Sequence, residues 1–175
     1  RHDAPEKRPA LTVFPAYPGM KLSTLDDHLL RPRIGSGLAG ARRHAVEFLY
    51  FGIKEARASL FAGLFFAAVF LVPREGLLGV PRYDALLVIA VAIQAWMVWA
   101  KLETMDELKA IMVFHLVGFS LEVFKTSSGI KSWAYPDFAY TKVMGVPLFS
   151  GFMYAAVGSY IIQAWRLVDL QVKHH

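Results

Sequence analysis

The chain has 175 residues, of which 55% are hydrophobic and 19% charged, and the charged share is below the quarter usual for soluble domains. Its net charge of +5 is unevenly placed, because residues 1–57 hold ten of the nineteen Lys and Arg. Such a basic region favours anionic lipid headgroups, and without a zinc motif or an aromatic-lined basic groove we expect no nucleic acid partner. The absence of Cys excludes thiolate nucleophiles, disulfides and iron–sulfur clusters.

Residues 1–40 are expected to form a basic, Pro- and Gly-containing cytoplasmic tail. Four prolines among the first 19 residues indicate an extended chain. Residues 22–30 predict a short amphipathic helix that Pro32 ends. The glycines that follow match the spacing of a dinucleotide-binding loop, but no strand precedes them, so a hinge is the better interpretation. Residues 41–57 then predict a helix near the membrane interface.

Four hydrophobic segments follow, and their lengths decide the fold class. They are free of Asp, Glu, Lys and Arg over residues 58–73, 85–100, 110–121 and 143–165. A membrane-spanning helix needs about 20 residues, so flanking residues must extend the first three. The first would include Lys54 and Arg57, whose charges would reach back to the headgroups. The first two segments are apolar around their whole circumference, which argues against a soluble helical domain.

The expected fold is therefore all-α: a polytopic helical membrane protein with about four transmembrane helices plus an N-terminal amphipathic or interfacial helix. The transmembrane domain would cover residues 41–170, and residues 171–175 would form a cytoplasmic stub. Within this domain the spans are predicted at about residues 53–73, 85–102, 108–124 and 143–165.

The distribution of basic residues predicts the orientation. With a cytoplasmic N-terminus, 14 Lys and Arg lie on the inner side and five on the outer side. The positive-inside rule therefore places both termini in the cytoplasm. The charges between the second and third spans are predicted to form a solvated cytoplasmic turn, in which Glu103 and Asp106 could also contact a partner; they are Lys101, Glu103, Asp106, Glu107 and Lys109.

Unexpected polar residues concentrate on the third helix and in the loop after it. His115, Gly118 and Glu122 follow one another at helical steps of three and four, so they share a face. A carboxylate inside a span costs about 2.5–3.5 kcal/mol on insertion scales, and intramembrane acids are therefore candidates for function. We predict Glu122 as proton donor or polar anchor with Asp137 as its partner, both catalytic candidates. The predicted ligand-binding residues are His115, Lys125, Trp133, Tyr135 and Tyr154.

A purely structural role for these residues is the alternative interpretation. Glu122 would then pair with Lys125 or Lys131 at the headgroups, and His115 would bond to a neighbouring backbone. No metal site is predicted, because His115 and Glu122 lie two helical turns apart, about 10 Å along the axis.

The fourth segment carries a face of small residues. Gly151, Ala155 and Gly158 recur at steps of four and three, which allows close approach of helix backbones. We expect this face to pack against a neighbouring helix. Tyr154 and Gln163 add hydrogen-bonding groups that could line a cavity or lock two helices together.

Distinctive motifs occur at residues 51–58, 81–84, 102–104, 106–109, 114–116, 122, 124–125, 132–133, 135–136, 145–147, 150–154 and 163–166. Together they resemble the YoaT-like family of uncharacterised bacterial integral membrane proteins, over about residues 48–170. The resemblance implies a polytopic inner-membrane protein with no assigned activity. Family members are longer, with further spans and a second acid-plus-Trp-Tyr-Pro segment, so a pocket formed by this chain alone would be half built.

These observations lead to two functional hypotheses. In the first, the third helix and the following loop line a pocket that binds or acts on a hydrophobic small molecule such as a lipid or isoprenoid. Residues 122–135 alone are similar to bacterial carotenoid hydratases and cyclases, which motivates the isoprenoid. In the second, the chain is a non-catalytic accessory subunit of a larger membrane complex. A transporter is a third possibility, although no inverted repeat is visible. The residues indicate no particular cofactor.

Overall fold

The computed structural model describes residue 26 and residues 40–168. This part of the chain is predominantly helical, as predicted. The helices are α2 (Ala41–Ala58), α3 (Leu60–Leu71), α4 (Arg82–Trp99), α5 (Met105–Thr126) and α6 (Ser150–Val168). The helix predicted over residues 22–30 lies outside the described residues, apart from Asp26, which is helical.

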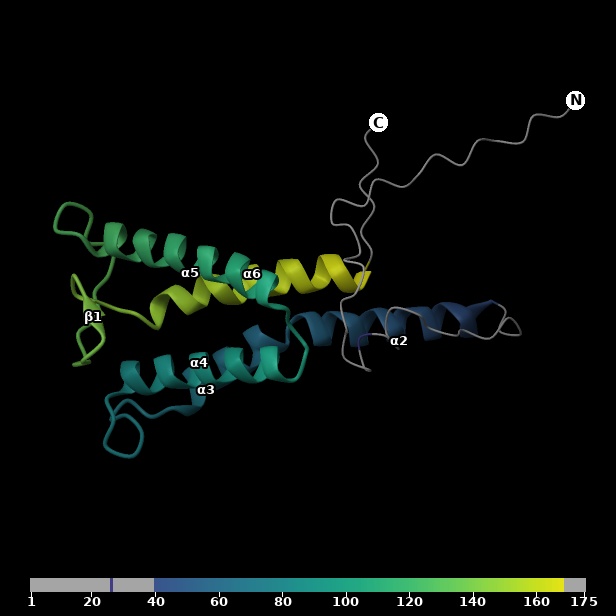
Figure 1. Cartoon of the computed structure of the whole chain (residues 1–175), viewed down its shortest axis with the longest axis horizontal. Helices are drawn as coiled ribbons and strands as arrows, with labels where there is room; N and C mark the ends of the chain where they lie inside the picture. Colours follow the sequence, from purple (N-terminus) through teal and green to yellow (C-terminus); the bar gives the residue numbers. More distant parts are fainter. Residues whose placement is uncertain (1–25, 27–39, 169–175) are drawn as a thin grey trace, which may run out of the picture.

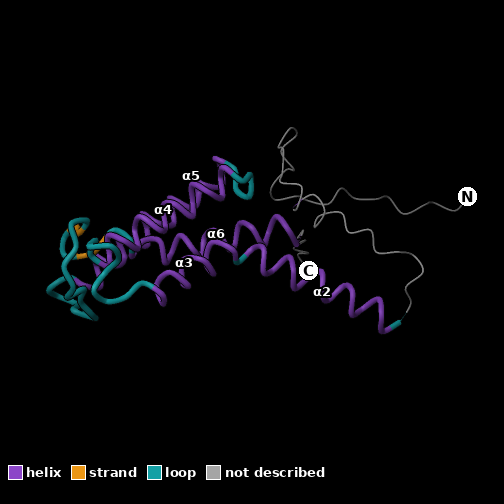
Figure 2. The backbone as a smooth tube through the Cα atoms, turned by 90° about the horizontal axis from the view of Figure 1, so that it is seen from below, coloured by secondary structure: helices purple, strands orange, loops and turns teal. Residues whose placement is uncertain are grey.

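The helices run back and forth along the long axis of the molecule (Figure 1). The closest pair is α5 and α6, while α3 packs against both α4 and α6. The connections between α3 and α4 and between α5 and α6 lie together at one end (Figure 2). We call this the loop end, and we call the opposite end, where α4 turns into α5, the turn end.

The predicted first span is divided between two helices. The end of α2 and the whole of α3 are separated at Ser59, but the backbone bonds continue across the joint, from Ser59 N–H to Glu55 O at 2.9 Å and from Gly63 N–H to Ser59 O at 2.7 Å. The start of α2 projects from the turn end (Figure 1).

A local motif sets the start of α5. The Thr104 hydroxyl accepts a hydrogen bond from Glu107 N–H at 3.2 Å, and the Glu107 carboxylate accepts one from Thr104 N–H at 2.7 Å. This reciprocal capping box satisfies two backbone donors that the first helical turn would otherwise leave free. The helix therefore starts at Met105, whereas the apolar pattern predicted a start at residue 108.

The predicted fourth span is wrong at its beginning. Residues 143–149 were predicted to be helical, but they are not. The chain here forms a short antiparallel pair of strands, β1 (Lys142–Val143) and β2 (Val146–Pro147). The two residues between the strands, Met144 and Gly145, have φ of 54° and 81°. A two-residue hairpin turn needs this left-handed backbone, which a helix excludes. The helix therefore begins at Ser150.

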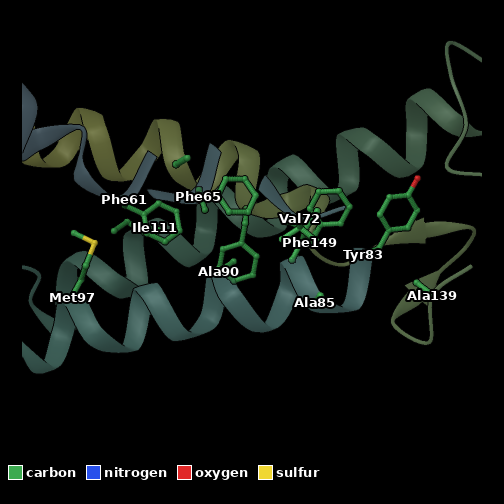
Figure 3. Packing of buried hydrophobic residues seen from close by; sticks show 14 of the residues in the cluster. Phe61, Phe65, Val72, Tyr83, Ala85, Ala90, Met97, Ile111, Ala139 and Phe149 are labelled. Atoms are coloured by element: carbon green, nitrogen blue, oxygen red, sulfur yellow. The ribbon is translucent and has the colours of Figure 1, made fainter. Parts of the chain in front are cut away.

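The core lies along the contact between the helix layers (Figure 3). Phe61 and Phe65 of α3 are fully buried and stack at a ring distance of 6.1 Å. Met97 of α4 and Ile111 of α5 are buried beside them in the same cluster. Because these side chains come from three helices, their burial fixes the packing of the bundle rather than of any single pair.

The small-residue face predicted on the fourth helix packs against α5, which confirms that prediction. An added Cβ would lie 2.7 Å from the His115 ring at Gly151 and 2.6 Å from the Phe114 ring at Gly158. From the other side, a Cβ at Gly118 would lie 2.2 Å from Tyr154. The absence of these side chains is what lets the two backbones approach so closely.

Among the described helices, Arg82–Trp99 is the one long and apolar enough to cross a membrane by length and composition. Leu60–Leu71 is apolar but shorter.

Candidate functional site

The loop end holds a buried carboxylate surrounded by aromatic donors. Glu122, in the last turns of α5, is only 1% exposed. Its Oε2 accepts hydrogen bonds from Trp133 Nε1 at 3.0 Å and Tyr135 Oη at 2.8 Å, and its Oε1 accepts one from Tyr154 Oη at 2.7 Å. We call Glu122, Lys125, Trp133, Tyr135 and Tyr154 the Glu122 cluster.

Lys125 supplies the opposite charge in this cluster. Its Nζ lies 3.5 Å from Glu122 Oε1 and donates a hydrogen bond to Tyr154 Oη at 2.7 Å. The same ammonium lies 4.9 Å from the centre of the Trp133 ring, within cation–π range. Because the Lys125 side chain remains 34% exposed, solvent screens much of this pairing.

The loop between α5 and α6 brings Tyr135 to the carboxylate. Its ring packs edge-on against Tyr83 and Phe149 at 5.8 and 6.4 Å, and Lys142 Nζ donates to the Tyr135 carbonyl at 2.6 Å. Burial, with the nearby Glu122 carboxylate, raises the pKa of the Tyr135 phenol. The raised pKa favours the protonated phenol, which is the form that donates to Glu122.

Two predicted site residues lie apart from this cluster. Asp137 is exposed and interacts with Tyr83, and no hydrogen bond between described residues joins it to Glu122. His115 is buried against Phe152, with ring centres 4.5 Å apart. Its Nδ1 has no hydrogen-bond partner within the described part of the chain.

The predicted pairing of Glu122 with Asp137 is therefore not seen. Both carboxylate oxygens of Glu122 instead accept hydrogen bonds from Trp133, Tyr135 and Tyr154. The described ranges contain no group of three His, Asp or Glu that could hold a metal ion.

The turn end contains a second polar cluster, which the sequence did not predict. Glu103, expected in a solvated turn, is only 2% exposed. Leu102 N–H and Glu103 N–H both bond to Met97 O, which folds the chain back onto α4. The Glu103 carboxylate then accepts hydrogen bonds from Ser159 Oγ at 2.5 Å and from Gln94 Nε2. Burial raises its pKa.

The prediction for Arg57 is also wrong. Its side chain is buried and does not extend to a headgroup layer. Arg57 Nε and Nη2 donate to the two oxygens of Asp26 at 2.9 and 3.0 Å, and Nη2 also bonds to Leu102 O at 2.7 Å. A buried guanidinium needs such partners, because burial of an unpaired charge is strongly unfavourable.

Arg166 completes this group. We call Arg57, Arg166, Asp26, Leu102 and Glu107 the arginine cluster. Its Nη2 donates to Asp26 Oδ2 at 3.0 Å and to Leu102 O at 2.9 Å. Its Nη1 lies 2.9 Å from Glu107 Oε1. The two guanidinium groups thus share the same acceptors. Only the presence of charges near predicted span ends hinted at this group, because its members are far apart in sequence.

Comparison with known proteins agrees with the resemblance inferred from sequence motifs. Residues 47–175 match a family model described as "Protein of unknown function (DUF817)". The chain is 48% identical over 126 residues to the uncharacterized protein YoaT of Bacillus subtilis (strain 168). That alignment covers 72% of this chain and 47% of the relative, so the chain spans about half the length of that protein. No solved structure matches. The family match covers most of the chain, which therefore belongs to the DUF817 family of proteins of unknown function.

Proposed function

We propose that the described part of the chain is a polytopic domain of the bacterial cytoplasmic membrane, with the turn end facing the cytoplasm. The outward side chains along the bundle support this proposal. Each helix from α3 to α6 exposes large apolar residues, a surface more continuous than soluble monomers tolerate. Examples are Phe66 and Phe70 on α3, Val88 and Val91 on α4, Val117 and Leu121 on α5, and Val157 and Ile161 on α6.

Helix lengths are consistent with this arrangement. At 1.5 Å per residue, the 18, 22 and 19 residues of α4, α5 and α6 extend over about 27, 33 and 29 Å. The hydrocarbon core of a bilayer is about 30 Å thick. The 12 residues of α3 reach this length only together with the end of α2.

Labelling of single cysteines tests the orientation, because the chain has no native Cys. Ser128 lies in the exposed loop end and Asp106 in the exposed turn end. In spheroplasts, a membrane-impermeant maleimide should label Ser128→Cys at once and Asp106→Cys only after permeabilisation. The reverse pattern would invert the topology. Equal labelling of both variants in sealed spheroplasts would contradict a membrane-spanning bundle.

Within this domain, we propose that the Glu122 cluster binds the polar group of a hydrophobic molecule of lipid or isoprenoid type. The supporting observation is a buried carboxylate at the end of an apolar helix pair, with donors from both the loop and α6. Trp133 is 45% exposed, so a ligand hydroxyl can take over its bond to Glu122 without disturbing Tyr154. Exposed Phe138 and Tyr140, whose rings contact each other at 4.9 Å, offer apolar surface in the same loop.

The test is the hydrophobic content of the purified protein, measured by native mass spectrometry and by analysis of an organic extract. The wild-type protein should retain a bound molecule that Glu122→Gln loses, because the amide cannot match the charged acceptor. Ser120→Ala is the matched control, since the hydroxyl of this exposed serine on the same helix bonds, among the described residues, only to Leu116 O. Unchanged ligand content in a folded Glu122→Gln protein would refute the proposal.

A second candidate function is that of a subunit that packs against another membrane protein. The observation that favours it is an apolar stripe on α2, opposite the side that contacts the bundle. Phe48 is 76% exposed, and a Cβ on Gly52 would meet nothing within 4 Å. The stripe consists of Ala45, Phe48, Leu49, Gly52, Ile53 and Ala56, all exposed.

Cross-linking distinguishes this candidate from a monomeric role. Gly52→Cys in native membranes should form a cross-link to a partner helix under mild oxidation or with a short bifunctional reagent. Gly63→Cys is the matched control, because it also faces open space but lies on α3. Equal cross-linking at both positions, or at neither, would count against a docking role for α2.

A further inference from the structure

The arginine cluster brings the buried Arg57 and the partly buried Arg166 to one acceptor group. Arg57 of α2 and Arg166 of α6 both donate to Asp26 Oδ2, at 3.0 Å each. Both also bond to the carbonyl oxygen of Leu102, at 2.7 and 2.9 Å. Asp26 itself is 0% exposed. Two helices from distant parts of the sequence thus form one carboxylate-binding site, which we call the receptor.

Among the described residues, the charges at this receptor balance only while Asp26 is in place. Arg57 and Arg166 contribute two positive charges, and Glu107, 2.9 Å from Arg166, offsets one of them. Glu103 also lies near Arg57, but burial raises its pKa, which favours its neutral form. Removal of Asp26 would leave a net positive charge inside the protein, where an unpaired ion is strongly destabilising.

Some donors of the arginine cluster and of Gln163 have no acceptor among the described residues. Within the described residues, Arg57 Nη1, Arg166 Nε and Gln163 Nε2 are buried and lack hydrogen-bond partners. A carboxylate has two acceptor oxygens, whereas a phosphate has up to four. Guanidinium groups bind both kinds of anion in forked geometry.

The residues that bind Asp26 lie in the part of the chain that matches the family, whereas Asp26 lies outside it. The family match covers residues 47–175, which include Arg57, Leu102, Glu107 and Arg166. Asp26 precedes this range. The cationic site is therefore built entirely from the family-matched part of the chain, and its anion comes from outside that part.

We propose that Arg57 and Arg166 form an oxyanion-binding site at the turn end, which Asp26 occupies as a tethered ligand and which takes a phosphate group when Asp26 is removed. The phosphate group belongs either to a free anion or to an anionic lipid headgroup. This inference does not depend on a ligand at the Glu122 cluster, which lies at the opposite end of the bundle.

Chemical rescue tests the site. The full-length chain with Asp26→Ala is purified in a neutral detergent, and its thermal unfolding is followed with increasing inorganic phosphate and with chloride at matched ionic strength. We expect a lower midpoint than in the wild-type protein, and phosphate but not chloride should raise it, because a ligand stabilises the state that binds it. The wild-type midpoint should not respond, since Asp26 fills the site.

Further variants separate this site from general salt effects. The double variant Asp26→Ala with Arg57→Gln should lose the phosphate response. Asp106→Ala is the matched control, because Asp106 is an exposed carboxylate paired with Lys109 at 2.7 Å; its midpoint should neither fall nor respond. Micelles containing phosphatidylglycerol, compared with phosphatidylcholine, distinguish a lipid headgroup from free phosphate. Stabilisation by phosphatidylglycerol alone would assign the lipid.

Two results would overturn the proposal. One is an Asp26→Ala protein that unfolds at the wild-type midpoint. The other is a destabilised Asp26→Ala protein in which neither phosphate nor phosphatidylglycerol does more than its control. If Asp26→Ala cannot be purified in plain buffer, the same variant, which leaves the site vacant, is extracted with and without phosphate. Recovery of folded protein in phosphate alone supports the site, and equal failure in both buffers refutes it.

Discussion

Substitution of Gly118 by Ala tests the central contact of the bundle. An ideal Cβ at this position would lie 2.2 Å from Cγ of Tyr154, far inside the 3.5–4.0 Å at which carbon atoms pack best. Overpacking of this kind costs about 1–3 kcal/mol. The Tyr154 ring cannot simply move away, because its hydroxyl is held by Glu122 and Lys125 at 2.7 Å each.

The expected effect follows from these terms. Loss of one hydrogen bond to a charged group adds about 1.5–3 kcal/mol, while the better helix propensity of Ala returns about 1 kcal/mol. Gly118→Ala should therefore lower the free energy of unfolding by about 1.5–5 kcal/mol. Gly63→Ala, on a helix face where the new Cβ meets nothing within 4 Å, should be neutral or raise it by up to about 1 kcal/mol.

The measurement is the unfolding midpoint of both variants in the same detergent, followed by far-ultraviolet circular dichroism. If Gly118→Ala unfolds at the same midpoint as Gly63→Ala, the close approach of α5 and α6 is incorrect. The description of the Glu122 cluster would then also fail, because the position of Tyr154 depends on that approach.

Three further outcomes follow from particular contacts. Tyr154→Phe removes the hydroxyl shared by Glu122 and Lys125 and should lower the free energy of unfolding by about 1.5–3 kcal/mol. An equal unfolding midpoint for the wild type and this variant would show that the hydroxyl is dispensable. Burial raises the pKa of Glu103 above the usual value for a Glu side chain. Its contribution to stability is therefore fully present below that usual pKa and is lost as pH rises through the raised pKa. Glu103→Gln should flatten the dependence of the unfolding midpoint on pH, and an unchanged profile would contradict this prediction. Gly145→Ala places a side chain at φ 81° and should lower the free energy of unfolding by about 1–2 kcal/mol. The same unfolding assay measures this change, and an unchanged stability would refute the turn geometry.

Local sequence signals predicted much of the helical framework. The apolar segments indicated where most of the helices lie. A helix can be predicted from such a local stretch because its backbone hydrogen bonds join residues that are close in sequence. The small-residue face of Gly151 and Gly158 correctly indicated close helix packing. The hairpin at Met144 and Gly145 was missed because apolar content alone does not separate a short strand pair from the start of a helix.

The Glu122 cluster was partly accessible from the sequence. Glu122 and the loop residues Trp133 and Tyr135 are separated by 11 and 13 positions, so one loop can bring them together. Tyr154 is 32 positions from Glu122, and the sequence indicated it only as a hydrogen-bonding group on the fourth apolar segment. Asp137 satisfied the same criterion of short separation, yet the loop directs it elsewhere, since spacing limits reach and does not fix direction.

The sequence by itself determined a helical, strongly apolar chain with one polar helix face, because these properties depend on composition and on periodicity along the chain. Only the tertiary structure decided that Arg57 and Glu103 are buried, since their partners lie 31 and 56 positions away. A charged residue near the end of an apolar segment looks the same in sequence whether water or another side chain neutralises it. Packing of helices against one another selects between these outcomes, because a buried charge persists only where the fold supplies its partner.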